Sequence, residues 1–196
     1  MNGKKEIGAS VAPQGEGRSN VARVLDWGEF AVAELLSLSG LLWLVLMMIH
    51  AGPLWRDELC SVNLAESASL KVFWEHLHHD SCPILWPAIL RGWLWLGLSG
   101  NPEIRVLGFL IGVCMLASPW LIARWVGKRV PILSASLLAF SPAVLFTASS
   151  LRAYGLGSLM LVLTVGLTWR AVEHDSPGRL AWLAVSSILA AHSLYT

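Results

Sequence analysis

Residues 30–52, FAVAELLSLSGLLWLVLMMIHAG, form the first long apolar run of this 196-residue chain, and residues 53–58, PLWRDE, follow it directly. About 20 apolar residues are enough to cross the hydrocarbon core of a bilayer as a helix. Only a helix or a closed barrel pairs its own backbone groups there. A charge at the bilayer centre costs about 2.5–3.5 kcal/mol. Asp57 and Glu58 are therefore predicted to lie at a membrane boundary, as candidates for an active site.

The composition indicates an integral membrane protein. Hydrophobic residues make up 55% of the chain and charged residues 14%, and the mean hydropathy is +0.60. A typical soluble domain contains about 25% charged residues. The net charge of +1 provides no basic field, and no zinc-finger or arginine-rich pattern occurs, so nucleic acid is not expected as a partner. The 11 Trp residues are expected mainly as anchors at the membrane interface.

Further apolar runs predict an all-α, polytopic helical bundle with about five transmembrane helices. These runs lie at about residues 103–123, 131–148, 153–169 and 180–195. Residues 1–28 are polar and are predicted to form a disordered cytoplasmic tail, followed by a transmembrane module over residues 29–196. The first run lies too far from the start for a cleaved signal and is predicted to remain as an anchor.

A short run at residues 84–97 decides the topology. It contains Pro87 and Arg91 among several Trp residues, which favours a helix in the interface plane over one that crosses the bilayer. The basic segments 124–129 and 170–179 then share the cytoplasmic side with the N-terminal tail, as the positive-inside bias favours.

This topology predicts two extracytoplasmic segments, residues 53–102 and 149–152, on the same face of the membrane. Within the first, an apolar stripe with helical spacing predicts a juxtamembrane amphipathic helix that begins after Ser67 or Ser69. Its stripe consists of Leu70, Phe73, Trp74 and Leu77.

Asp57 and Glu58 are the strongest catalytic candidates. A carboxylate on the corner that Pro53 starts could act as a general base or bind a divalent cation such as Mg²⁺ or Mn²⁺, and Asp57 is the candidate metal ligand. The structural alternative is an ordinary interfacial acid paired with Arg56.

Three further groups on this face are candidates. His76, His79 and Asp80 have a spacing that suits metal ligands, although solvated histidines on a polar face are commoner, and Asp80 is the better candidate as a second acid. Arg152, beside Tyr154, is either a phosphate ligand or a snorkelling anchor of its helix. A Cys60–Cys82 disulfide is permitted outside the cytoplasm.

The order of several short motifs resembles the N-terminal half of membrane glycosyltransferases with the GT-C fold, near bacterial protein mannosyltransferases and aminoarabinose transferases (glycosyltransferase family 39). The motifs, over roughly residues 32–196, are PLWRDE (53–58), Asn63-Leu64-Ala65, His79-Asp80 with Pro83, Glu103-Ile104-Arg105, Ser141-Pro142 and LRAYGL (151–156).

The resemblance implies a hexosyl- or pentosyltransferase of the cell envelope. Its donor would be a polyprenyl-phosphate-linked sugar, and its acceptor a lipid, glycan or protein outside the inner (plasma) membrane. Asp57 would be the base or metal ligand with Glu58 beside it, and Asp80, His79, Arg152 and Tyr154 would bind substrate.

The chain departs from this family at two points. Many relatives carry an acid at the position of Ser150, and most have eight to thirteen spans, so this chain is expected to be the N-terminal part of such an enzyme. The alternative is a non-catalytic membrane subunit or lipid-binding scaffold derived from one.

Overall fold

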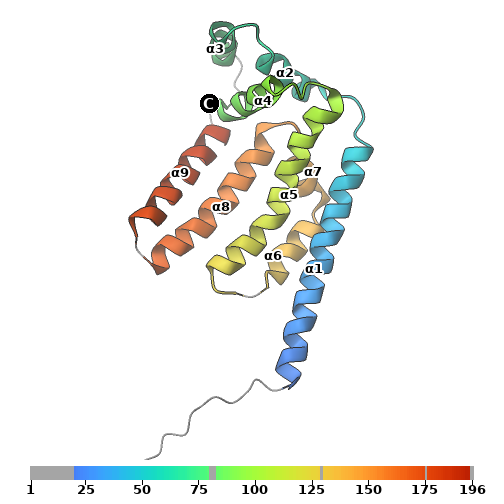
Figure 1. Cartoon of the computed structure of the whole chain (residues 1–196), viewed down its shortest axis with the longest axis vertical. Coiled ribbons are helices and arrows are strands. Elements are labelled where there is room, and N and C mark those ends of the chain that lie inside the picture. Colours follow the sequence, from blue (N-terminus) through green and yellow to red (C-terminus); the bar gives the residue numbers. More distant parts are fainter. Residues whose placement is uncertain (1–19, 80–82, 129, 175, 195–196) are drawn as a thin grey trace, which may run out of the picture.

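The computed structural model describes residues 20–79, 83–128, 130–174 and 176–194, and regular structure in that part of the chain is α-helical throughout (Figure 1). The all-α prediction is confirmed for these residues. The helices are α1 (Asn20–Ile49), α2 (Arg56–Ala65), α3 (Leu70–His79), α4 (Leu85–Trp95), α5 (Asn101–Trp125), α6 (Ile132–Ala139), α7 (Pro142–Ser149), α8 (Ala153–Glu173) and α9 (Pro177–Leu194).

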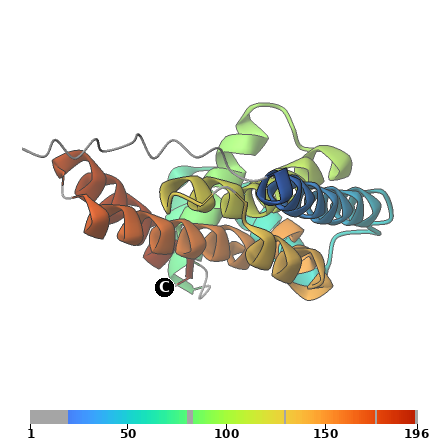
Figure 2. The same cartoon turned by 90° about the horizontal axis from the view of Figure 1, so that it is seen from below.

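The long helices stand side by side, and the short helices α2, α3 and α4 lie over one end of them (Figure 1). Helices α1 and α9 occupy opposite edges of the bundle in both views (Figures 1 and 2). The ends of α1 and α7 and the starts of α5 and α8 lie at the end that carries α2–α4. Residues 50–58 and 149–152 therefore meet at one end of the molecule.

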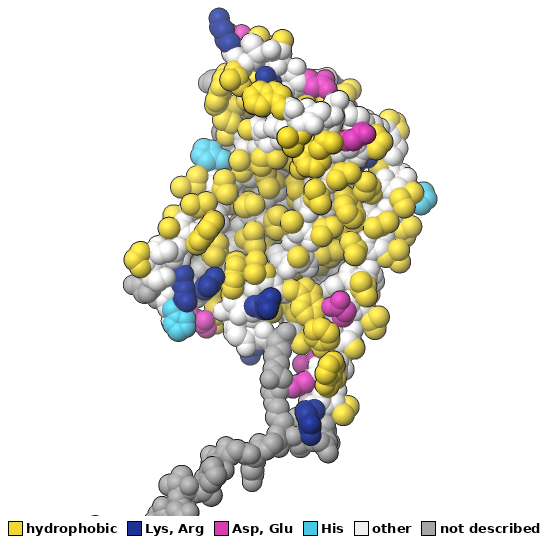
Figure 3. Space-filling view, in the orientation of Figure 1, with side chains coloured by type: hydrophobic (Ala, Val, Ile, Leu, Met, Phe, Trp, Pro, Cys, Tyr) yellow, Lys and Arg dark blue, Asp and Glu magenta, His cyan; other side chains and the backbone are white. Residues whose placement is uncertain are grey.

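In the part of the chain that the structure describes, three helices are long and apolar enough to cross a membrane: residues Arg23–Ile49 of α1, α5 and α8. The pair of α6 and α7 would provide a fourth span if it crosses as one unit. Hydrophobic side chains cover the middle of the face in Figure 3, and most charged side chains lie toward its two ends. This distribution is consistent with a membrane protein.

The expected continuous helix over residues 131–148 is wrong. The structure has two helices of eight residues, α6 and α7, which are bent by 79° relative to each other. Proline disfavours helical geometry in the residue before it and lacks an N–H, and Ser141, which precedes Pro142, adopts φ −116° and ψ 79°. The sequence therefore breaks the helix at this point.

A fifth span is not shown. The predicted run at 180–195 corresponds to α9, which has 18 residues and packs against α8. Helix α9 is not among the described helices that are long and apolar enough to cross a membrane.

The segment between α1 and α5 forms a cap that is tied together by Arg91 of α4. Its buried guanidinium donates through Nη1 to the carbonyl oxygens of Ala65 and Ser67, at 2.9 Å each, and lies over the rings of Phe73 and Trp95. Helix α4 has 11 residues, about 16 Å at 1.5 Å per residue, which is too short to span a bilayer. The juxtamembrane placement of α2–α4 stays a prediction.

The start of α3 and the position of Trp86 compare differently with the expectations from the sequence. Helix α3 begins after Ser69, whose hydroxyl accepts a hydrogen bond from the Val72 N–H at 3.2 Å, as an N-cap does. Trp86 of α4 is fully buried in the core, so it does not fit the interface role expected for the Trp residues.

Glycines allow the end of α7 to approach its neighbours closely. A Cβ on Gly108 of α5 would overlap the backbone oxygen of Ser149, and a Cβ on Gly155 of α8 would overlap that of Ala148. Small residues at such crossings let helix backbones approach each other in membrane bundles. The position of residues 149–152 therefore depends on these two glycines.

Replacement of Gly108 by alanine tests this packing. Because the added methyl meets backbone rather than a flexible side chain, we expect Gly108→Ala to lower the free energy of unfolding by about 1–3 kcal/mol. Thermal unfolding in detergent measures the effect. Gly92 of α4 is the matched control, since nothing lies within 4 Å of its Cβ position, and Gly92→Ala should be neutral or stabilising. Equal behaviour of the two variants would contradict the close contact.

Candidate functional site

The site starts at the corner where α1 ends and α2 begins. Trp55 is the N-cap of α2, with φ −68° and ψ 157°, and Glu58 is the third residue of the helix. The Glu58 carboxylate accepts a hydrogen bond from the Trp55 N–H through Oε2, at 3.0 Å. This hydrogen bond satisfies an N–H that the helix itself leaves unpaired, and the first turn of a helix favours negative charge. Residues within PLWRDE thus stabilise the turn that leads from α1 into α2.

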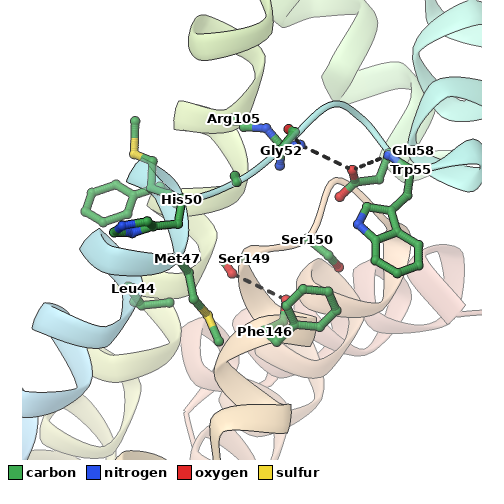
Figure 4. A pocket seen from close by; sticks show the side chains of 13 residues that line it. Leu44, Met47, His50, Gly52, Trp55, Glu58, Arg105, Phe146, Ser149 and Ser150 are labelled. Atoms are coloured by element: carbon green, nitrogen blue, oxygen red, sulfur yellow. Dashed lines mark hydrogen bonds and ion pairs between the residues drawn. The ribbon is translucent and has the colours of Figure 1, made fainter.

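Glu58 also joins this corner to the second segment. Its Oε1 accepts a hydrogen bond from the backbone N–H of Leu151, at 3.1 Å. Arg105 of α5 lies on the other side, with Nη2 3.8 Å from Oε2 of Glu58 and 2.6 Å from the Gly52 carbonyl oxygen, to which it donates (Figure 4). Glu58 is only 4% exposed. Its carboxylate is therefore the buried joint between three segments of the chain.

Asp57, the neighbouring acid, faces outward and pairs with Arg152. Oδ2 of Asp57 lies 2.5 Å from Nη2 of Arg152, and the side chains are 61% and 41% exposed, respectively. The Arg152 guanidinium carbon lies 5.1 Å from the ring centre of Tyr154. Asp57 thus pairs with Arg152 of the second segment. The alternative expected from the sequence was an ordinary interfacial acid paired with Arg56. This ion pair is accessible to a ligand.

Two adjoining pockets open beside this corner. The smaller, of about 180 Å³, is lined by Asp57, Arg152 and Tyr154 with part of α7. The larger, of about 320 Å³, extends along the end of α1 and includes Arg105 and His50 (Figure 4). Their common wall consists of Trp55, Glu58, Phe146 and Ser150. The apolar part of the larger pocket consists mainly of Leu44, Met47, Met48, Phe109 and Phe146.

The structure brings four of the predicted site residues together: Asp57, Glu58, Arg152 and Tyr154. Asp80 lies outside the described residues, and His79 ends α3 with a side chain that is also outside them. The prediction that residues 57 and 152 share one end of the bundle agrees with their direct contact.

The sequence did not predict a place in the site for three residues that line the pockets, Arg105, Trp55 and Phe146. Arg105 had a usable signal, since it is a cation in the first turns of an apolar helix that starts at the same end. Phe146 had none, because its position on the pocket wall follows from the bend between α6 and α7.

The carboxylates do not form a metal site by themselves. Asp57 faces the guanidinium of Arg152, and Glu58 accepts from two backbone N–H groups, so both acids are turned toward donors. Among the described residues, no group of three or more His, Cys, Asp and Glu side chains could hold a metal ion. The candidate set of His76, His79 and Asp80 lies partly outside those residues.

Cys60 and Ser150 also had expectations attached to them, although Cys60 lines neither pocket. Cys60 is exposed on α2 as a free thiol, and its expected partner Cys82 lies outside the described residues. Ser150, at the position where the family resemblance expects an acid, donates its hydroxyl proton to the Thr147 carbonyl oxygen at 2.8 Å.

No protein-family model, curated protein or solved structure matches this chain. The resemblance to GT-C glycosyltransferases stays a prediction.

The two adjacent acids should respond differently to loss of charge. In Glu58→Gln one buried backbone N–H would face an amide N–H₂ donor in place of a carboxylate oxygen. We therefore expect the free energy of unfolding to fall by about 1–3 kcal/mol. Asp57→Asn alters an exposed ion pair, and the expected loss is below about 1 kcal/mol. Unfolding of both variants in detergent measures this contrast, and a larger loss for Asp57→Asn would contradict the assigned positions.

Proposed function

We propose that this chain is part of a GT-C-type membrane glycosyltransferase, which moves a hexose or pentose from a polyprenyl-phosphate carrier to a lipid, glycan or protein acceptor. The observation that carries the proposal is the accessible Asp57–Arg152 pair, which stands in a pocket at one end of the apolar helices. An amphiphilic donor needs a cation for its phosphate beside an apolar wall for its chain, and the two adjoining pockets provide both.

The chemistry follows from the two members of the pair. Arg152 presents a planar, permanently charged group that suits phosphate oxygens. When the donor phosphate takes over the guanidinium, the Asp57 carboxylate is released to accept the proton of the acceptor hydroxyl. The acceptor oxygen forms a bond to the anomeric carbon from the opposite side, and the bond from that carbon to the phosphate oxygen breaks. The polyprenyl phosphate leaves as an anion, which Arg152 stabilises.

In this proposal the other residues hold the pair in place. Glu58 keeps the corner of α2 against Leu151, so its role is positioning, and Tyr154 supports the guanidinium of Arg152. Asp80 and His79 remain proposed substrate-binding residues. Among the described residues, no group of three or more His, Cys, Asp and Glu side chains could hold Mg²⁺ or Mn²⁺, and a divalent cation stays a proposed cofactor.

The proposed orientation places the site outside the inner membrane and the N-terminus in the cytoplasm. Basic residues at the start of α1, at or just after the end of α5, near the end of α8 and at the start of α9 support it, because these helix ends lie opposite to α2–α4 (Figure 1). These residues are Arg23, Arg124, Lys128, Arg170 and Arg179.

Replacement of Asp57, the proposed general base, tests the proposed glycosyltransferase activity. In proteoliposomes with a sugar-linked polyprenyl phosphate, Asp57→Asn should lower sugar transfer by at least about 100-fold, because general-base catalysis contributes 10²–10⁴. Binding of the lipid should persist in this variant and weaken in Arg152→Gln. Glu66→Gln is the control, since Glu66 is exposed at the same end and lines neither pocket. Full transfer by Asp57→Asn would remove Asp57 from the mechanism.

A lipid-binding scaffold is the second candidate. It is favoured by the hydroxyl of Ser150 where the resemblance expects an acid, and by the pairing of the Asp57 carboxylate with Arg152. This reading predicts that the unaltered chain binds the lipid without transfer. The same assay therefore separates the two candidates.

A further inference from the structure

We propose that Trp55 and Phe146 hold the sugar ring of the donor between them, at the place where the two pockets meet. This inference rests on the proposed function and assigns the part of the site that recognises the sugar. Both residues line both pockets, and they come from separate elements, the corner before α2 and helix α7 (Figure 4).

The two aromatic side chains are exposed although they are large and apolar. Trp55 is 71% exposed and Phe146 is 52% exposed. Trp182 of α9 and Phe140, which follows the last residue of α6, have comparable exposure, at 67% and 79%, and line neither of the two pockets. An anchor role in lipid explains Trp182 and Phe140 fully. It leaves unexplained why Trp55 and Phe146 share the wall between the two pockets, one of which contains Arg152 and the other Arg105.

The backbone of Trp55 is fixed at both of its polar groups. Its N–H donates to Oε2 of Glu58 at 3.0 Å, and its carbonyl oxygen accepts from the Leu59 N–H at 2.8 Å. Glu58 is in turn bound to the Leu151 N–H, beyond the end of the helix that carries Phe146. One ring thus projects from the start of α2 and the other from α7, and one buried carboxylate connects these two segments. A pre-organised wall of this kind loses little conformational entropy when a ligand binds.

The chemistry of the wall suits a sugar ring. A pyranose or furanose has faces of polarised C–H groups, which pack against the negative face of an aromatic ring, and an edge of hydroxyls. The hydroxyl protons of Ser149 and Ser150 are donated to the carbonyl oxygens of Phe146 and Thr147, at 3.3 and 2.8 Å. Their oxygen lone pairs remain to accept hydrogen bonds from a ligand. The wall therefore combines aromatic faces with acceptors for hydroxyl donors.

The place of the ring also agrees with the proposed reaction. Trp55 and Phe146 share the smaller pocket with Arg152 and Asp57, so a phosphate on Arg152 would carry its sugar next to them. Asp57 lines the same smaller pocket, so the acceptor hydroxyl that it would deprotonate is expected beside the sugar there, while the larger pocket offers its apolar wall to the polyprenyl chain.

Binding of two lipids to the full chain in nanodiscs tests the inference. The probes are a short polyprenyl phosphate and the same lipid carrying a sugar on its phosphate, each measured by its Kd. We expect the unaltered chain to bind the sugar-carrying lipid about tenfold more tightly. Trp55→Leu and Phe146→Leu should each remove most of this difference. Trp55→Leu should leave the affinity for the sugar-free lipid unchanged, and Phe146→Leu should change it little, because leucine keeps an apolar surface for the polyprenyl chain. Trp55→Phe keeps an aromatic face and should keep most of the difference.

Matched controls and the alternative outcomes make the test decisive. Trp182→Leu and Phe140→Leu remove exposed aromatics away from the site and should leave both affinities unchanged. A Trp55→Leu variant that keeps the tenfold difference, or loses both lipids equally, overturns the sugar contact while the proposed function stands. Equal binding of both lipids by the unaltered chain overturns it as well. Failure to bind either lipid would overturn the proposed function itself, and the inference with it.

Discussion

The site depends on one buried carboxylate. A charge removed from water is costly unless hydrogen bonds and opposite charge compensate it, and Glu58 obtains both from the N–H groups of Trp55 and Leu151 and from nearby Arg105. Since Asp57 precedes Glu58 and Arg152 follows Leu151, this joint also brings Asp57 to Arg152. The exposed ion pair is thus positioned by a buried one. Its outward direction leaves it free for a ligand, while the neighbouring acid stabilises the fold.

Close helix packing supports this joint from below. Gly108 and Gly155 let α5 and α8 approach the last turn of α7, which places the irregular residues 150–152 against the start of α2. Non-helical backbone within a membrane protein is tolerated where protein or a water-filled cavity surrounds it. The bend between α6 and α7 brings Phe146 and the two serines into the pocket walls. Packing and site geometry are therefore consequences of the same few contacts.

The sequence predicts the coarse architecture because apolar length is a direct physical signal. It marked the runs that became α1, α5 and α8, and the count of crossings placed Asp57 and Arg152 at one end. It did not reveal the break in 131–148, although Ser141-Pro142 carried that information, because apolarity does not report helix direction. It also could not separate Asp57 from Glu58. Consecutive residues on a helix point about 100° apart, and only the packing of α2 shows which of them faces inward.

Thiol cross-linking between positions 57 and 152 tests most directly whether the two segments that carry them lie next to each other. In a chain whose three cysteines, Cys60, Cys82 and Cys114, are replaced by serine, Asp57→Cys with Arg152→Cys should be linked within one chain by a short bifunctional maleimide. Asp57→Cys with Lys128→Cys, which places the second thiol at the opposite end of the bundle, should not be linked. Efficient linkage of the first pair alone is the predicted result. Absence of that link, or labelling of positions 57 and 152 from opposite sides of the membrane, would contradict the account.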